Sequence, residues 1–203
     1  MKTVSILCRG KSLKYINDIS LADQCILVNA FHYELQNNDI HNYVSACPIV
    51  THVVSLGALF QQMISDKVYE KYNFDKIVLP YVKEETPTIP SYMNNINGPN
   101  GILPITSLSD INKKDMISNS RYAFTSPTCG MDAVVYSINE LSPDVINIIG
   151  MDFYEQSGYL AENVEYDVVM KRCSAEGKQL KEFLPEFVRQ HTDVNFNIYT
   201  YAN

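Results

Sequence analysis

The stretch TSPTCGMDAVVYSINELSPDVINIIGMDFYEQSGY, residues 125–159, is the part of the chain that best predicts its fold. A turn of small residues opens it, a helical pattern follows at residues 131–141, and a short apolar strand occupies residues 145–149. This strand ends abruptly at Gly150 and Asp152. Small residues before a helix leave backbone N–H groups open to an anion or a nucleobase, and a glycine after a strand lets a ligand approach the backbone. Because ligands of open α/β sheets bind beyond the carboxyl ends of the strands, this stretch predicts one wall of a ligand site.

Outward from this stretch, β-rich runs alternate with helical patterns. We predict strands at residues 3–8, 25–28, 48–55, 76–79, 145–149 and 195–199. We predict helices at residues 13–19, 56–65, 106–118, 131–141 and 174–189. Such alternation is typical of an α/β domain with a mainly parallel sheet and helices on both faces.

The length of 203 residues fits one domain, so we expect a single unit over residues 1–203. Its hydrophobic content of 46% and charged content of 19% are typical of a globular chain. Proline and asparagine are concentrated at residues 84–104, which predicts a long loop that is either a lid or a surface excursion. A second, mobile loop is expected around residues 155–170.

Several classes of function are disfavoured by composition. The formal net charge of −7 argues against nucleic acid as the main partner, and no apolar run approaches the roughly 20 residues that span a bilayer. The amino-terminal residues predict a strand and not a signal peptide. The five cysteines and four histidines are dispersed without metal-ligand spacing, which predicts a cytoplasmic protein with free thiols and no metal site.

Two further turns follow predicted strands. After the first strand, the Gly10 backbone and the Ser12 hydroxyl either hold a nucleotide or form an ordinary turn with Ser12 as helix N-cap. A P-loop, and with it a phosphotransferase that binds Mg-ATP through Lys11, is disfavoured because Ser5 stands where the motif needs glycine. After the second strand, the Asn29 amide either reads a nucleobase or sugar or merely terminates the strand.

Four segments, in order, resemble motifs of the bacterial sialyltransferases that use CMP-activated sugars, and more distantly those of animal sialyltransferases. They are RGKSLK at residues 9–14, NAFHYE at residues 29–34, TCG at residues 128–130, and GMDFY at residues 150–154 with Tyr159. These are similar to the family's GNGPSLK, NQFYFE, TSG and GIDFY, the last followed by a tyrosine. The resemblance covers most of the chain except residues 58–124.

The resemblance implies a nucleotide-sugar-binding fold of the GT-A sialyltransferase type that works without a metal or other cofactor. The residues that would line the CMP site are Gly10, Ser12, Asn29, Thr128, Cys129, Gly130, Gly150 and Asp152. Tyr154 and Tyr159 would donate hydroxyls to the CMP phosphate, because phenol donors can stabilise a departing phosphate without a cation. Arg9 replaces the family's asparagine, and its added charge either grips phosphate or faces solvent.

One departure concerns the general base. The family has a histidine shortly before its last long helix, whereas this chain has no histidine between His52 and His191. Lys171 and Arg172 stand there instead, with ordinary pKa values of about 10.4 and above 12 that do not suit a base at neutral pH. We expect them to hold the donor's carboxylate or phosphate, while a carboxylate or water deprotonates the acceptor.

Two functional hypotheses follow. The first is a transferase that moves a sialic acid or related keto-sugar acid from a CMP-sugar donor to a glycan or lipid-linked glycan. The second is a non-catalytic CMP or nucleotide-sugar binding protein on the same fold. Both predict CMP binding, and only the first predicts release of CMP. A homo-oligomer is compatible with either hypothesis.

Overall fold

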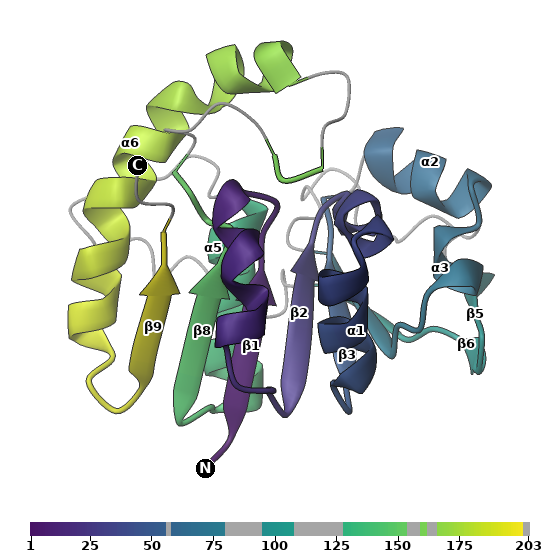
Figure 1. The fold of residues 1–203 in the computed structure, drawn as a ribbon, viewed down its shortest axis with the longest axis horizontal. Helices are drawn as coiled ribbons and strands as arrows, with labels where there is room; N and C mark the ends of the chain where they lie inside the picture. Colours follow the sequence, from purple (N-terminus) through teal and green to yellow (C-terminus); the bar gives the residue numbers. More distant parts are fainter. Residues whose placement is uncertain (56–57, 80–94, 108–127, 154–158, 162–165, 201–203) are drawn as a thin grey trace.

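The computed structural model describes residues 1–55, 58–79, 95–107, 128–153, 159–161 and 166–200 (Figure 1). Seven parallel strands form one sheet in the order β7-β4-β3-β2-β1-β8-β9. Their bounds are β1 Thr3–Leu7, β2 Gln24–Val28, β3 Val50–Val53, β4 Lys76–Leu79, β7 Ile105–Ser107, β8 Val145–Ile149 and β9 Asn195–Tyr199. The predicted mainly parallel α/β fold is confirmed.

The order of the strands creates a switch point between β1 and β8. From β1 the chain steps outward through β2, β3, β4 and β7, and it then returns to place β8 on the other side of β1. Ser5 of β1 is therefore paired with Cys25 on one side and with Asn147 on the other. In doubly wound sheets the crevice for ligands opens at such a point, beyond the carboxyl ends of the two strands.

The helices cover both faces of the sheet (Figure 1). On one side lie the 3₁₀ helices η1 (Lys11–Asp18) and η2 (Phe31–Gln36) with α1 (Asn38–Ala46), α2 (Ala58–Ser65) and α3 (Val68–Lys71). On the other lie α6 (Tyr166–Gln190) and α5 (Cys129–Tyr136), which continues as a π-helical turn at Ser137–Leu141. A small antiparallel hairpin joins β5 (Asn97–Gly98) to β6 (Gly101–Ile102).

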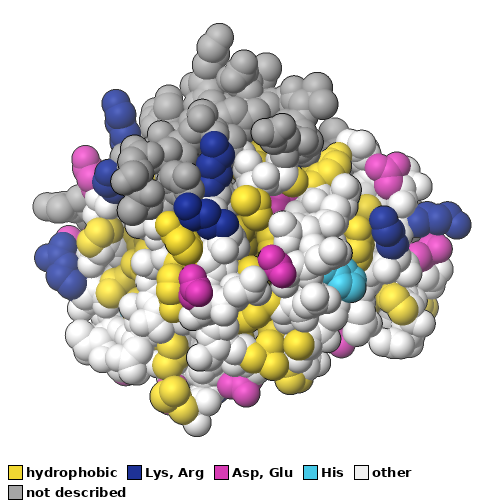
Figure 2. Space-filling view, in the orientation of Figure 1, with side chains coloured by type: hydrophobic (Ala, Val, Ile, Leu, Met, Phe, Trp, Pro, Cys, Tyr) yellow, Lys and Arg dark blue, Asp and Glu magenta, His cyan; other side chains and the backbone are white. Residues whose placement is uncertain are grey.

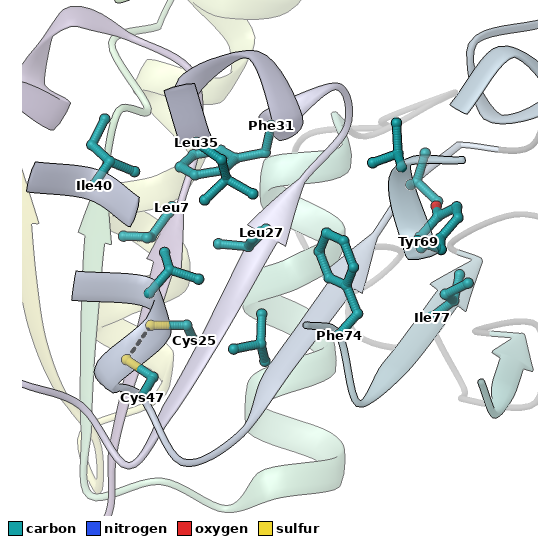
Figure 3. Packing of buried hydrophobic residues seen from close by; sticks show 14 of the residues in the cluster. Leu7, Cys25, Leu27, Phe31, Leu35, Ile40, Cys47, Tyr69, Phe74 and Ile77 are labelled. Atoms are coloured by element: carbon teal, nitrogen blue, oxygen red, sulfur yellow. Dashed lines mark hydrogen bonds between the residues drawn. The ribbon is translucent and has the colours of Figure 1, made fainter. Parts of the chain in front are cut away.

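Alternation along the strands divides the buried side chains into two clusters. Leu7 points to the face covered by η1, η2 and α1, where it packs with Leu27 and Phe31 (Figure 3). Ile6 points to the opposite face and belongs to the second cluster, which includes Phe183 of α6. Because central parallel strands are covered on both faces, they read as continuous apolar runs, which is why these strands could be predicted closely.

The side chains of four cysteines are described, and all four are buried and free, as expected for a chain with free thiols. Cys25 on β2 and Cys47 after α1 are in contact within the cluster of Figure 3. Burial raises the pKa of the Cys8 thiol well above its ordinary value, and the neighbouring Asp152 carboxylate raises it further. A thiol held in its protonated form is a poor nucleophile, so Cys8 is not suited to covalent catalysis.

Several predicted elements differ from the structure. The helix expected from residue 106 is wrong at its start, because Ile105 pairs with Ile77 and begins the edge strand β7, a long-range contact that local pattern does not encode. The loop expected at residues 84–104 contains the β5–β6 hairpin in its described part. The last helix begins at Tyr166 and not at residue 174, and it continues through Pro185 to Gln190. The mobile loop expected around residues 155–170 is therefore wrong from Tyr166 onward.

Candidate functional site

The carboxyl ends of β1 and β8 remain paired beyond the strands themselves. The Cys8 N–H donates to the Ile149 carbonyl at 2.7 Å, and the Gly10 N–H donates to the Gly150 carbonyl at 2.8 Å. The residues that follow the two strands are thereby brought side by side at the switch point. Two of the four segments of the resemblance, the Gly10 turn and the Gly150 turn, meet here.

Ser12 and Asp152 form the centre of this arrangement. The Ser12 hydroxyl donates to Asp152 Oδ1 at 2.6 Å, and the Ser12 N–H donates to Oδ2 at 2.9 Å. The same hydroxyl accepts from the Gly150 N–H at 2.8 Å. Ser12 is fully buried, whereas Asp152 is partly exposed. The alternative of Ser12 as a helix N-cap is wrong, since the N-cap of η1 is Gly10 and makes no side-chain hydrogen bond.

The two glycines of the site are required by the closeness of the strand ends. A Cβ on Gly10 would collide with the Asp152 carboxylate and would lie 2.6 Å from the Gly150 carbonyl oxygen. Gly150 has a φ of 77°, and a Cβ there would collide with the Cys8 carbonyl. Their predicted contact with a nucleotide stays a prediction. In this structure the groups that approach them are the protein's own backbone and Asp152.

Asn29 ends β2 in a left-handed conformation with a φ of 54°, which asparagine tolerates better than most residues. Its carbonyl accepts from His52 Nε2 at 2.6 Å, while His52 Nδ1 pairs with the Tyr69 hydroxyl at 2.9 Å. Burial lowers the pKa of His52 to about 4. His52 is therefore a neutral residue that donates from Nε2, and its role is to hold the backbone of Asn29.

The side chain of Asn29 connects β2 to the start of α5. Its Oδ1 accepts from the Ser55 hydroxyl at 3.4 Å, and that hydroxyl lies 2.8 Å from the Cys129 sulfur. Thr128 caps α5, because its Oγ1 accepts from the Met131 N–H at 3.3 Å. The third segment of the resemblance thus lies next to the second.

The first turn of α5 also packs tightly against the strand ends. A Cβ on Gly130 would lie 2.8 Å from Cε of Met151 and 3.1 Å from Sγ of Cys8. No side chain larger than hydrogen fits there without displacing one of these two. The amino terminus of α5, where the helix dipole is positive, is thereby held at the switch point.

Tyr159 lies across the end of β1, where it forms an isolated antiparallel bridge with Gly10. The guanidinium carbon of Arg9 is 4.1 Å from the centroid of the Tyr159 ring and 5.3 Å from that of Tyr33. Arg9 Nε donates to Glu34 Oε1 at 3.1 Å, and the two side chains are 11% and 0% exposed. Of the two alternatives for Arg9, a solvent-facing side chain is therefore wrong.

Burial dominates the electrostatics around Arg9. It raises the pKa of Glu34 to about 7, although the charge and hydrogen bond of Arg9 act in the opposite direction. Burial also lowers the pKa of His32 to about 4, and the positive charge of Arg9 adds to this effect. His32 is consequently neutral at pH 7.

The remaining predicted site residues fall in different places. Tyr154 lies outside the described residues. Lys171 and Arg172 lie in the first half of α6, which passes above the carboxyl edge of the sheet in Figure 1. His191 follows α6 shortly before β9 begins, so it lies at the opposite, amino edge of the sheet. It cannot replace the family's histidine.

Three residues that organise this edge, Glu34, His52 and Ser55, are not among the predicted site residues. Ser55 was included in a predicted strand, yet β3 ends at Val53. A serine two positions after a parallel strand lies at the carboxyl edge of the sheet. With the end of the strand predicted at Val53, Ser55 would have been a candidate site residue. Glu34 stands within the motif at residues 29–34, but its partner Arg9 could be found only in three dimensions.

Within the described ranges, no group of three or more His, Cys, Asp and Glu residues could hold a metal ion. In the same ranges, no helix has the length and apolarity needed to cross a membrane. Comparisons of the chain with protein-family models, with curated protein sequences and with solved structures find no significant match.

Proposed function

We propose that the protein is a metal-independent glycosyltransferase of the GT-A sialyltransferase type, with a CMP-activated acidic sugar as donor. The donor sugar is a sialic acid or a related keto-sugar acid. The observation that carries this proposal is the convergence of the four resembling segments at one switch point. Ser12 and Asp152, which bond directly, are 140 residues apart, and Gly10 pairs with Tyr159.

The nucleoside half of CMP suits the Asp152 side of the site. A carboxylate accepts hydrogen bonds only, and the ribose hydroxyls and the cytosine amino group are donors. Ser12 uses one acceptor position on each Asp152 oxygen and fixes the orientation of the carboxylate. The negative charge of Asp152 would repel phosphate, so the phosphate belongs on the side of Tyr159 and the amino end of α5.

The acidic sugar of the proposed donor needs cations near the carboxyl edge of the sheet. The chain carries a net charge of −7, and Figure 2 shows Lys and Arg side chains in the upper half of the molecule, with Asp and Glu side chains among them. Lys171 and Arg172 belong to the half of α6 above this edge, and in the proposal they hold the carboxylate of the acidic sugar.

In the proposed reaction the acceptor hydroxyl attacks the anomeric carbon while the bond from that carbon to the phosphate oxygen breaks. CMP leaves with the bonding electrons, and the Tyr159 and Tyr154 hydroxyls donate to the oxygen that gains charge. The acceptor proton passes to a carboxylate or to water.

A second candidate, a non-catalytic CMP-binding protein, is favoured by one observation. His52 has both ring nitrogens bonded, and His191 lies at the far edge, so neither can act as general base. In the catalytic proposal a carboxylate or water takes that role.

Calorimetric titration with CMP and with Mg-ATP, followed by a CMP-release assay with CMP-sialic acid and CMP-keto-sugar acids, tests these alternatives. We expect CMP to bind, Mg-ATP not to bind, and CMP to be released in the presence of an acceptor. CMP binding without release from any donor would favour the non-catalytic protein. Mg-ATP binding that is lost on Lys11→Ala would overturn both in favour of a P-loop enzyme.

A further inference from the structure

The segment Tyr159 to Ala161 is attached to the end of β1 by several independent contacts. Tyr159 bridges Gly10, and the Leu160 N–H donates to the Arg9 carbonyl at 2.9 Å. The Arg9 guanidinium faces the Tyr159 ring, and a hydrogen bond from the Ala161 backbone favours the ionised form of Glu34. Residues 159–161 are therefore held at the end of β1 by both backbone and side-chain contacts.

The Arg9–Glu34 ion pair is built into the fold and does not lie on its surface. Glu34 is fully buried in η2, and Arg9 follows β1 directly, so the pair connects the ends of the first two strands. Burying an ion pair costs the free energy of desolvating both charges. The attraction between the charges offsets this cost only when their geometry is fixed. Among the described residues, Glu34 Oε2 has no hydrogen-bond partner, so Arg9 supplies the main compensation for this charge.

These contacts leave Arg9 poorly suited to bind phosphate. It pairs with Glu34, and its guanidinium carbon lies 5.3 Å from the centroid of the Tyr33 ring and 4.1 Å from that of Tyr159. An arginine stacked on aromatic rings stabilises the position of those rings.

We propose that Arg9 and Glu34 are positioning residues that together fix Tyr159 across the carboxyl end of β1. We call this pair the Arg9–Glu34 clamp. Its effect on catalysis rests on the proposed function, because Tyr159 matters there as a donor to the leaving phosphate. The clamp itself is independent of any ligand.

A tryptophan reporter tests the clamp directly. The chain contains no tryptophan, so Tyr159→Trp introduces a single tryptophan at the clamped position, and tryptophan preserves the cation–π contact with Arg9. In this background we compare Glu34→Gln with the double substitution Arg9→Met and Glu34→Leu. The double substitution removes both charges at once, which avoids the uncompensated buried charge that could prevent folding.

We expect acrylamide quenching of the reporter to increase at least about twofold in both clamp variants, because the segment opens locally. The matched control is the double substitution Arg189→Met and Glu186→Leu, which removes a pair in α6 at 3.3 Å whose arginine is exposed and whose glutamate is partly exposed. Quenching should not change in the control. Unchanged quenching in both clamp variants, with folding verified by circular dichroism, would overturn the clamp.

Kinetic measurements on variants that retain Tyr159 distinguish a positioning role of Arg9 from direct binding of CMP by Arg9. We expect the double clamp variant to lower kcat with little change in CMP affinity. Tyr159→Phe should then have a smaller effect than it has with the clamp intact, because the two act through one position. A loss of CMP affinity with unchanged kcat would overturn the clamp and make Arg9 a direct ligand. If the wild type does not bind CMP, the proposed function fails, while increased quenching still supports the clamp.

Discussion

The Ser12 hydroxyl donates a hydrogen bond of 2.6 Å to Asp152, 140 residues further along the chain. This bond joins the turn after β1 to the turn after β8, and these two strands flank the switch point. Because Ser12 is fully buried and Asp152 is partly exposed, Ser12 acts on a ligand mainly by fixing the Asp152 carboxylate.

Replacing Ser12 should affect both stability and CMP binding. Ser12→Ala leaves the Gly150 N–H and Asp152 without this partner, and we expect a loss of about 1–3 kcal/mol in the free energy of unfolding. CMP binding should weaken by about 1 kcal/mol as Asp152 loses its fixed orientation. Denaturant titration and calorimetry measure the two effects, with the exposed Ser45→Ala in α1 as control. Wild-type values for both would contradict the assigned role of Ser12.

Two substitutions of Asn29 separate its backbone role from its side-chain role. Asn29→Ala places a Cβ-bearing residue without an amide at a φ of 54° and should lower stability by about 1 kcal/mol. Asn29→Gly should retain stability because glycine adopts this φ freely. Both should weaken CMP binding, since both remove the amide. If Asn29→Gly binds CMP as the wild type does, Asn29 only terminates β2.

The hydroxyls of Tyr154 and Tyr159 should matter most in the transition state. Tyr159→Phe keeps the ring that faces Arg9 and removes only the hydroxyl. We expect kcat to fall by about 10²–10³, or about 2–4 kcal/mol, with a smaller loss of CMP affinity, and a similar result for Tyr154→Phe. Tyr72→Phe, outside the four motif segments, serves as the control. A modest loss of stability with unchanged kcat would show that these tyrosines serve packing.

The pH dependence of stability should contain a contribution from His52. Its pKa of about 4 in the folded protein lies below its ordinary value of 6.5, so the folded state binds fewer protons between these values. His52 therefore contributes about 3 kcal/mol to the free energy of unfolding above pH 6.5, and this contribution is lost as the pH falls toward 4. His32 acts in the same direction. Glu34, with its pKa raised from 4.5 to about 7, acts oppositely, and its contribution is lost as the pH rises through 7.

Urea titrations at several pH values, on the wild type and on His52→Gln, measure this contribution. The variant should be less stable at pH 7, because it loses the hydrogen bonds to Asn29 and Tyr69, and its stability should fall less between pH 6.5 and 4. Equal slopes in the two proteins would show that His52 does not titrate as proposed.

Chelators should leave CMP release and folding intact. The described residues include no metal-binding group, and the proposed stabilisation of the leaving phosphate uses tyrosine hydroxyls. The assay is CMP release with and without EDTA, accompanied by a thermal melt. Activity that is lost with EDTA and restored by Mg²⁺ or Mn²⁺ would favour a metal-dependent glycosyltransferase.

The class of fold and most of the strands could be predicted from local sequence pattern. Residues 76–79, 145–149 and 195–199 were predicted with the bounds that β4, β8 and β9 have in the structure. A buried parallel strand is a short apolar run between polar turns, and this signal is local. The glycines and small polar residues after these runs also identified the edge of the sheet at which to look for a site.

Which partners those edge residues bind could not be predicted from the sequence, because the partners are brought close only by the tertiary fold. Ser12 could equally have capped η1, and Arg9 could equally have faced solvent, until Asp152 and Glu34 were placed beside them. Likewise, β7 is a strand because it pairs with β4. A turn residue has many partners within reach of its side chain. Which one it binds depends on the strand order, which brings residues 140 positions apart into contact and which local sequence pattern does not encode.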